Sequence, residues 1–173
     1  MTGNVYTVPP QPPVPEHTRI LAAGAITFGV EYRDLDPASL EATYAGNEAH
    51  LAELRETSPE GGFSDEGVSI HVSGTDDGHE YLRFDIFDDN PHYHYNHRVG
   101  EGEAVCNNII DFDPVAQGDM LPWAIERLRT RLAPMLEEAG GGHLVPQLDA
   151  ALIASVLDDV QAMADAARRA RAS

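Results

Sequence analysis

Hydrophobic and polar residues alternate with a period of two along several segments in the first two thirds of the chain. In AITFGVEYR (residues 25–33) every second residue is apolar, and similar alternation appears in GVSIHVSG, HEYLRFDIFDD, HYHYNH and AVCNNIIDFDP. This period is typical of β-strands with one buried face. The second and third of these segments flank TDDG, a turn sequence that predicts a hairpin. We therefore expect about five strands in one antiparallel sheet.

The apolar period changes to about 3.6 in the last third of the chain, which indicates helices. One apolar stripe runs from residue 121 to 135 and is interrupted by Pro134, which should kink or end that helix, and a final helix is expected from about residue 146. A further helix is predicted over residues 36–58, with Asp36 as its N-cap and Pro37 in its first position. Because most helices follow most strands, the predicted class is α+β: one antiparallel β-sheet of about five strands with helices, mainly the C-terminal ones, packed on one face.

The segment PPQPPVP (residues 9–15) fits neither a sheet nor a helix, because proline lacks an amide donor and has a fixed φ. Residues 1–16 are therefore expected to form a proline-rich extended arm. Residues 17–173 are expected to form a single α+β domain, sheet-rich over 20–114 and helical over 119–170. A chain of 173 residues is long enough for one such domain with its own hydrophobic core.

The charge of the chain narrows the classes of partner. It holds 29 acidic and 11 basic residues, for a formal net charge of −18. Such a field repels nucleic-acid phosphates and anionic lipid, so we expect neither nucleic-acid nor membrane binding. The longest mainly apolar run, residues 20–30, is shorter than the roughly 20 residues that span a bilayer. The lone Cys106 has no internal disulfide partner and no secretory signal pattern is found, so a cytoplasmic location is expected.

The strand face opposite the apolar residues is rich in side chains that carry chemistry. Alternation alone assigns to it Glu31, Arg33, His71, Tyr81, Arg83, Asp85, His92, His94, Asn107 and Asp111. We expect this polar face to be open to solvent or to a partner.

The segment DDNPHYHYNH (residues 88–97) contains the most specific pattern on the polar face. His92 and His94 point to the same side of one strand, about 6 to 7 Å apart, which suits chelation of one metal ion. Asp85, His71 or Asp111 would supply a third ligand if its strand is a neighbour of this one. A mixed imidazole and carboxylate set suits zinc, iron or manganese. The competing interpretation is a hydrogen-bonded face or a partner interface without a physiological metal.

Two functions are compatible with this face. The first, which we favour, is a non-enzymatic acidic accessory or subunit protein that needs no cofactor. It would dock onto a protein partner or a second copy through the N-terminal arm and the polar face, with Arg33, Tyr81 and Arg83 at the interface. The second is a small metal-dependent enzyme that uses the His-x-His strand, with Glu31 or Asp111 as general base. Strand order bears on this choice, because it determines whether a carboxylate lies beside the histidine pair.

Overall fold

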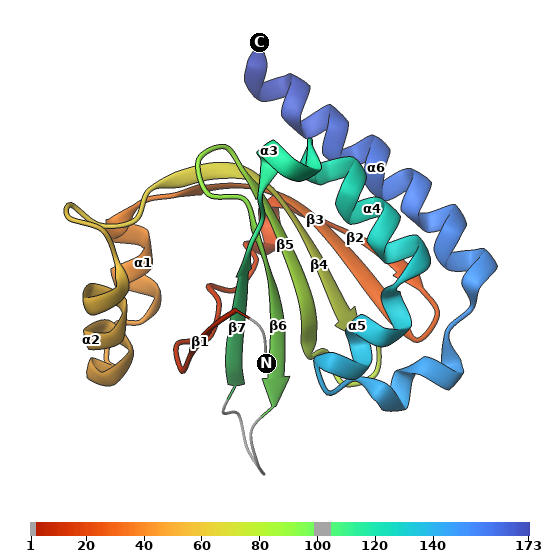
Figure 1. Cartoon of the computed structure of the whole chain (residues 1–173), viewed down its shortest axis with the longest axis horizontal. Helices are drawn as coiled ribbons and strands as arrows, with labels where there is room; N and C mark the ends of the chain where they lie inside the picture. The colour runs from red at the N-terminus through yellow and green to blue at the C-terminus, as the bar shows by residue number, and fades with distance from the viewer. Residues whose placement is uncertain (1–2, 99–104) are drawn as a thin grey trace.

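The computed structural model of the chain describes residues 3–98 and 105–173. Its centre is one seven-stranded antiparallel sheet (Figure 1). The strands are β1 (Asn4–Tyr6), β2 (Thr18–Ala23), β3 (Ile26–Leu35), β4 (Asp65–Gly74), β5 (Glu80–Phe87), β6 (His92–Arg98) and β7 (Val105–Asp111). Their order in the sheet is β1-β7-β6-β5-β4-β3-β2. From β2 to β7 each strand therefore pairs with the next one in sequence. The first strand, β1, instead pairs with the last, β7, and forms the edge of the sheet opposite β2.

The α+β class and the single antiparallel sheet are as predicted, but the expected number of about five strands is wrong. The two additional strands are the edge strands β1 and β2. The sequence of β2, TRILAA, has no regular alternation and leaves Ile20 67% exposed, so a search for period two does not detect it. A two-residue turn that contains Gly24, at a φ of +72°, joins β2 to β3. The three residues of β1 lie within the predicted arm and are too few to form a pattern.

Two helices, α1 (Pro37–Thr43) and α2 (Glu48–Thr57), replace the single helix expected over residues 36–58. Asp36 caps α1 as predicted: its carboxylate accepts a hydrogen bond from the Ser39 amide, and the Ser39 side chain completes a capping box. The helix is interrupted at Gly46, whose φ is +88°. The apolar spacing that predicted one helix continues on both sides of this turn and does not reveal it.

The C-terminal helices cover one face of the sheet (Figure 1). They are α3 (Pro114–Gln117), α4 (Met120–Thr130), α5 (Leu132–Glu138) and α6 (Ala150–Ala172), with a 3₁₀ helix, η2 (Gly142–Gln147), before α6. The break expected near Pro134 lies at Arg131, between α4 and α5. Apolar residues of these helices, such as Leu136 and Leu157, form the main core with the alternate apolar residues of the strands, such as Phe84. The predicted apolar strand face is therefore the face that the C-terminal helices cover.

One stretch of chain crosses the other face of the sheet. Because β1 and β2 lie at opposite edges, residues 7–14 and the short 3₁₀ helix η1 (Pro15–His17) connect one edge to the other. We call residues 7–14 the crossing segment. Its Val8 carbonyl accepts a hydrogen bond from Asn107, and its Val14 amide donates one to Glu31. Helices α1 and α2 lie on this side of the sheet too, opposite α4 to α6 (Figure 1).

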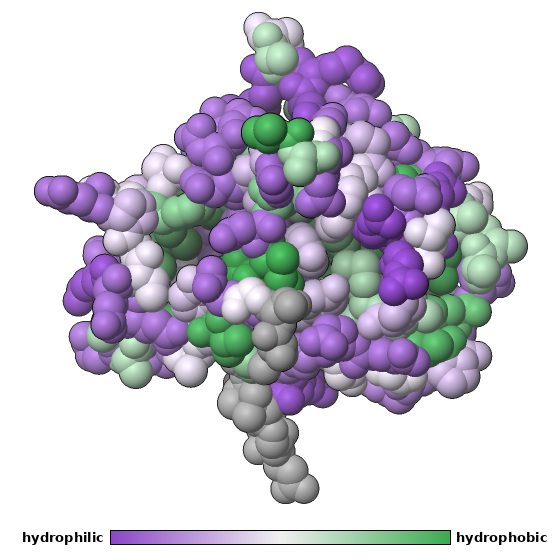
Figure 2. Space-filling model, in the orientation of Figure 1, coloured by the Kyte–Doolittle hydropathy of each residue, from purple (hydrophilic) through white to green (hydrophobic). Residues whose placement is uncertain are grey.

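The face of the molecule seen in Figure 2 is mostly polar, in keeping with the acidic composition. Apolar residues gather in the middle of this view, where β1 and β7 lie in Figure 1. None of the helices in the described ranges combines the length and the apolar character that crossing a bilayer requires.

Candidate metal centre and its pocket

The polar face predicted from alternation is buried, so the expectation of an open surface is wrong. Glu31, Arg83 and His94 are 2%, 2% and 4% exposed. Alternation within strands shows which residues share a face, but it does not show that the crossing segment and α1–α2 return over that face. Buried polar side chains require hydrogen-bond partners, and these residues find them largely in one another.

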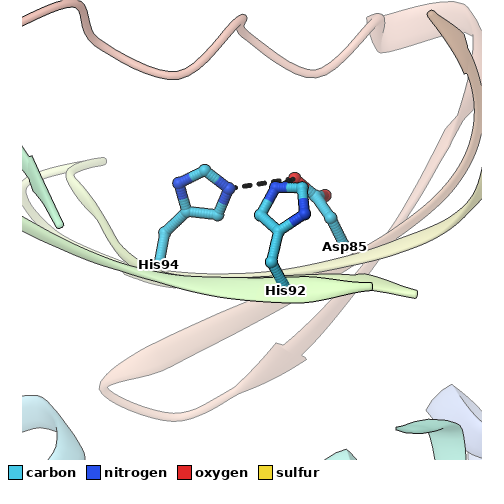
Figure 3. Close-up of side chains that lie close together, drawn as sticks. All are labelled: Asp85, His92 and His94. Carbon is cyan, nitrogen blue, oxygen red and sulfur yellow. Dashed lines mark hydrogen bonds and ion pairs between the residues drawn. The ribbon is translucent and has the colours of Figure 1, made fainter. Parts of the chain in front are cut away.

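Three of the predicted metal ligands lie together at the centre of this face. Because β5 and β6 are neighbours and Asp85 is the register partner of His92, the carboxylate and the His-x-His pair project from adjacent strands on the same side (Figure 3). The Nε2 atoms of His92 and His94 lie 3.3 and 3.0 Å from one atom, Oδ2 of Asp85. One potential ligand atom from each residue lies within 4.8 Å of the other two. We call these three residues the triad.

The other nitrogen of each imidazole ring faces a hydrogen-bond acceptor. Nδ1 of His92 lies 2.6 Å from the Asn90 carbonyl, and Nδ1 of His94 lies 2.7 Å from Oδ1 of Asn107. The orientation of the Asn107 amide follows from its second contact. Its Nδ2 lies 3.2 Å from the Val8 carbonyl of the crossing segment, and a carbonyl only accepts. Both Nδ1 atoms therefore carry a proton and donate it.

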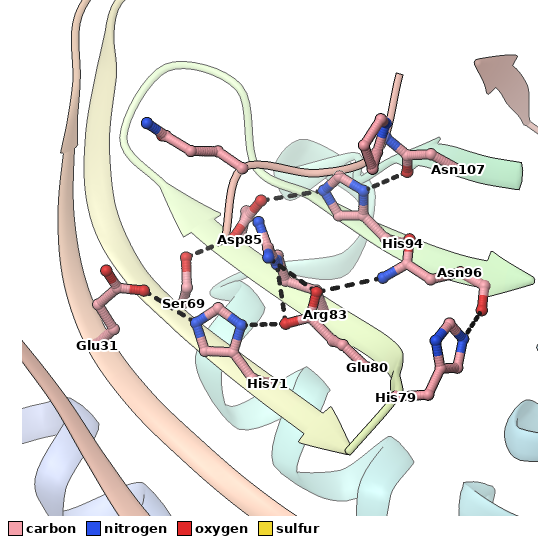
Figure 4. Close-up of polar contacts among 12 residues, drawn as sticks. Glu31, Ser69, His71, His79, Glu80, Arg83, Asp85, His94, Asn96 and Asn107 are labelled. Carbon is pink, nitrogen blue, oxygen red and sulfur yellow. Dashed lines mark hydrogen bonds and ion pairs between the residues drawn. The ribbon is translucent and has the colours of Figure 1, made fainter. Parts of the chain in front are cut away.

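A neutral histidine with its proton on Nδ1 presents a lone pair at Nε2. In the triad two such nitrogens point at one carboxylate oxygen, an arrangement that is repulsive unless a proton or a cation lies between the atoms. The other oxygen of Asp85, Oδ1, accepts a hydrogen bond from the Ser69 hydroxyl (Figure 4). The triad is thus arranged around positive charge, which is either a second proton on the rings or a metal ion bound by all three groups.

The electrostatics of the two histidines differ. Burial lowers the pKa of His94, and its contact with Asp85 opposes this effect without reversing it. Burial acts in the same direction on His92, but the contacts with Asp85 outweigh it and raise its pKa. Burial alone would raise the pKa of Asp85, yet both histidines hold it well below its usual value. His94 and Asp85 therefore favour the forms that bind metals, a neutral imidazole and an ionised carboxylate, whereas a metal ion would have to displace a proton from His92.

The two separations between the histidine nitrogens and the Asp85 oxygen fit a transition-metal ion. Histidine nitrogen and carboxylate oxygen bind zinc at about 2.0–2.1 Å, which places neighbouring ligands about 3.0 Å apart at octahedral angles and about 3.4 Å apart at tetrahedral angles. The separations of 3.0 and 3.3 Å from Oδ2 of Asp85 lie in this interval. The acceptors at Nδ1, a backbone carbonyl and a side-chain amide, are of the kind that orient metal-binding histidines.

The triad lines a cavity of about 270 Å³ between the sheet, the crossing segment and helices α1 and α2. The helix side of the cavity is largely apolar, with Leu40 from α1, Tyr44 directly after α1, Leu54 from α2 and Phe63 from the following loop. A concave site with apolar walls and a few convergent polar groups is typical of small-molecule pockets, and this volume is near the lower end of their range. The ligand that fits is therefore small.

His71, predicted as an alternative third ligand, lies outside the triad. Its Nε2 lies 3.0 Å from a Glu31 oxygen, and its Nδ1 contacts Glu80 (Figure 4). Glu80 also accepts two hydrogen bonds from Arg83, of 2.8 and 3.2 Å. Burial alone would lower the pKa of His71, but Glu80 and Glu31 outweigh burial and raise it. Glu31, predicted as a general base, is thus engaged in an ion-pair network beside the triad.

Tyr81 does not lie on the polar face, where strict alternation places it. A β-bulge near the start of β5 pairs Ser73 with Glu80 and Val72 with Leu82, so Tyr81 is the additional residue and packs into the main core. The same bulge places Glu80 on the polar face, which alternation does not predict. A bulge of this kind leaves no signal in the period of a strand.

The remaining predicted residues lie on the face assigned to them. Asp111 is the register partner of His92 and lines the cavity. Arg33 and Arg83 line it as well, but both are buried and therefore do not form an open interface. The groups that orient the triad were not predictable individually, because their roles arise from the register of the strands.

Fold and site together define an α+β protein with one antiparallel sheet and a histidine-carboxylate triad in a covered pocket. The chain belongs to a family described as a domain of unknown function, DUF7700, whose model matches residues 20–164. This range holds the triad and all the strands except β1 and the first residues of β2, and the crossing segment precedes it. Comparisons with curated proteins and with solved structures found no match.

Proposed function

We propose that the protein is a small metal-dependent enzyme that binds one divalent transition-metal ion through Nε2 of His92, Nε2 of His94 and a carboxylate oxygen of Asp85. The observation that carries this proposal is the convergence of two Nε2 atoms on Oδ2 of Asp85, while each Nδ1 is held by an acceptor. Without a metal, a second proton on His92 can balance the Asp85 carboxylate, but Nε2 of His94, whose pKa burial lowers, keeps a lone pair that faces the same oxygen. A metal ion satisfies all three atoms at once.

Three protein ligands leave coordination positions open, as catalytic metal sites do. When bound, the ion would activate water or polarise a substrate oxygen, and zinc, iron and manganese all suit this ligand set. Residues of the chain supply the surroundings. The apolar wall of the cavity limits access of water. Asp111, which lies beside His92 on the neighbouring strand and also lines the cavity, is placed to accept a proton from a bound substrate or water.

The first test is metal stoichiometry. The untagged chain is stripped with a chelator, loaded separately with zinc, manganese or, without oxygen, iron(II), and analysed by elemental mass spectrometry after dialysis. We expect about one ion per chain in the wild type and its loss in the double variant His92→Ala/His94→Ala. The exposed pair His17→Ala/His143→Ala is the matched control, since it removes two histidines outside the cavity. Equal metal content in both double variants would contradict the proposal.

A second test separates an open metal site from a purely structural one. In the manganese-loaded chain, an exchangeable water molecule on the ion increases the relaxation rate of bulk water protons. We expect this enhancement in the wild type, because three protein ligands leave open positions. A chain that binds manganese stoichiometrically without any enhancement would have a closed site, and the enzymatic part of the proposal would be wrong.

Docking onto a protein partner or a second copy stays a prediction. It would need either a surface other than the polar face or release of the crossing segment, because Arg33 and Arg83 are buried. Native mass spectrometry of the untagged chain tests it: a dimer or a retained partner protein would favour docking. A monomer without a partner at micromolar concentration would count against it.

A further inference from the structure

Arg33 forms a second polar site in the cavity, apart from the triad. The side chain comes from β3, is buried and lines the cavity. Its Nη1 donates a hydrogen bond of 3.1 Å to the backbone carbonyl of Gln11, and its Nη2 donates one of 2.9 Å to Oε1 of the same residue. Two oxygens of one residue thus bind the two terminal nitrogens of the guanidinium. A carboxylate does the same in a bidentate pair with arginine.

The positive charge of Arg33 is poorly balanced by its surroundings. The Glu31 carboxylate lies 4.0 Å from Nη1, but it is shared with a histidine and a backbone amide. Arg83, the other guanidinium of the cavity, donates two hydrogen bonds to the Glu80 carboxylate, whereas Arg33 donates none to a carboxylate of the described residues. Gln11 satisfies the donors of Arg33 without supplying charge. Burial and the nearby Arg83 lower the pKa of Arg33, and the charges of nearby carboxylates oppose this effect without reversing it.

The part of the crossing segment that carries Gln11 is suited to displacement. The prolines at positions 9, 10, 12 and 13 have no amide hydrogen and cannot donate to the sheet. Besides its contacts with Arg33, the Gln11 side chain donates a 2.8 Å hydrogen bond to the Thr43 hydroxyl, which is exposed, and a long one of 3.5 Å to the Ser39 carbonyl. Within the part of the chain that the structure describes, moving the Gln11 side chain aside breaks only these two hydrogen bonds besides those with Arg33, and water can replace the partner at Thr43.

We propose that Arg33 binds the carboxylate of a small anionic ligand, and that Gln11 takes this position as an internal substitute when the ligand is absent. The ligand class is a monocarboxylate with a compact apolar body. Its charged end pairs with Arg33 and its apolar part lies against the wall formed by Leu40, Tyr44 and Phe63. This inference deepens the proposed function, since it names the substrate class of the same cavity, but anion binding to Arg33 can be measured on metal-free protein.

The test is calorimetric titration of the metal-free full chain with benzoate and, separately, with its neutral analogue benzyl alcohol. We expect binding of benzoate and a preference over benzyl alcohol of at least about tenfold, because the guanidinium pairs with charge. Gln11→Ala should bind benzoate about two- to tenfold more tightly than the wild type, because it removes one competing hydrogen bond. Gln11→Glu places a competing carboxylate on Arg33, so it should abolish benzoate binding and raise the melting temperature.

Two further variants complete the test. Arg33→Lys keeps the charge but loses the two terminal nitrogens that make a bidentate contact, and we expect it to weaken benzoate binding at least about tenfold. The control Gln147→Ala removes a surface glutamine outside the cavity and should bind as the wild type does. The proposal is overturned if Gln11→Ala and Gln11→Glu bind benzoate alike, or if Gln11→Ala shows no preference over benzyl alcohol. A chain that holds metal without this preference would refute the Arg33 site alone, whereas a preference without stoichiometric metal would refute the metal proposal alone.

Discussion

Replacing Asn107 by leucine tests the reasoning on which the metal site rests, because this amide determines which nitrogen of His94 carries the proton. Asn107 is 5% exposed and makes two hydrogen bonds, of 2.7 Å with Nδ1 of His94 and of 3.2 Å with the Val8 carbonyl. Leucine is close in size but has no polar atoms, so the variant leaves a buried donor and a buried acceptor unpaired. Such a loss costs about 1–3 kcal/mol of stability per unpaired group.

The effect on metal binding should be larger than a general loss of stability explains. Removing the group that orients a metal-binding histidine lowers metal affinity by about 10- to 100-fold, and in Asn107→Leu the proton of His94 is free to move to Nε2, where it blocks the lone pair. Zinc affinity is measured by competition with a chromogenic chelator, and stability by urea unfolding of the metal-free chain.

Asn96→Leu is the matched control. Asn96 is the register partner of Asn107, is 1% exposed, and donates a long 3.4 Å hydrogen bond to Glu80, but it does not contact the triad. We expect Asn96→Leu to lower stability and to bind zinc as tightly as the wild type. If Asn107→Leu retains wild-type zinc affinity, the assignment of the His94 proton to Nδ1 has no consequence for metal binding, and the reasoning is refuted.

Three further predictions concern stability, and each is measured by urea unfolding. Burial opposes the ionisation of Glu80, but the guanidinium and imidazole beside it lower its pKa from 4.5 to about 2. Ionised Glu80 should therefore contribute about 3 kcal/mol to the free energy of unfolding above pH 4.5, and this contribution is lost as the pH falls towards 2. His71 should have the opposite pH dependence, because its pKa is raised: its contribution to the free energy of unfolding should be complete below pH 6.5 and lost as the pH rises through the raised pKa. Glu80→Gln should remove most of both pH effects. Gly67→Ala should destabilise by more than about 2 kcal/mol, because a Cβ there clashes with the backbone of β5. Gly142→Ala should change stability by less than about 0.5 kcal/mol, because a Cβ there makes only an ordinary van der Waals contact with Glu137. Leu136→Ala should cost about 2–5 kcal/mol, since Leu136 is 0% exposed in the main core, and a smaller loss would contradict its assignment to a tightly packed site.

Period-two alternation was sufficient to assign the inner strands and their faces, because a residue's side of a strand depends on local geometry alone. It placed His92, His94 and Asp85 on one face, and the meander of neighbouring strands brought them together. The same rule failed at Tyr81. The β-bulge there adds one residue to β5, so the residues before the bulge face the side of the sheet opposite to the one that alternation predicts. Local patterns therefore predict a site well only where the strand between the ligands is regular.

The burial of the polar face could not be predicted from the sequence, for a different reason. Nothing in PPQPPVP indicates that the chain crosses the sheet, because the prolines predict an extended backbone but not which part of the fold that backbone packs against. The partners of Arg33 and Asn107 in this segment are 22 and 99 residues away in sequence. Contacts at such separations depend on the strand order, which alternation does not determine.

The contact between Val8 and Asn107 also has a consequence for the order in which the protein folds. Strands β2 to β7 pair with their neighbours in sequence, and even the connection between β3 and β4, residues 36–64, is far shorter than the 99 residues that this contact closes. During synthesis the crossing segment leaves the ribosome long before β7 exists. We therefore expect the amide that sets the proton of His94 to be fixed only when the last strand is in place, so that the proposed metal site would form in one of the final steps of folding. A nascent or partly folded chain would then be a poor metal ligand, and the capacity to hold an ion would report that the fold is complete.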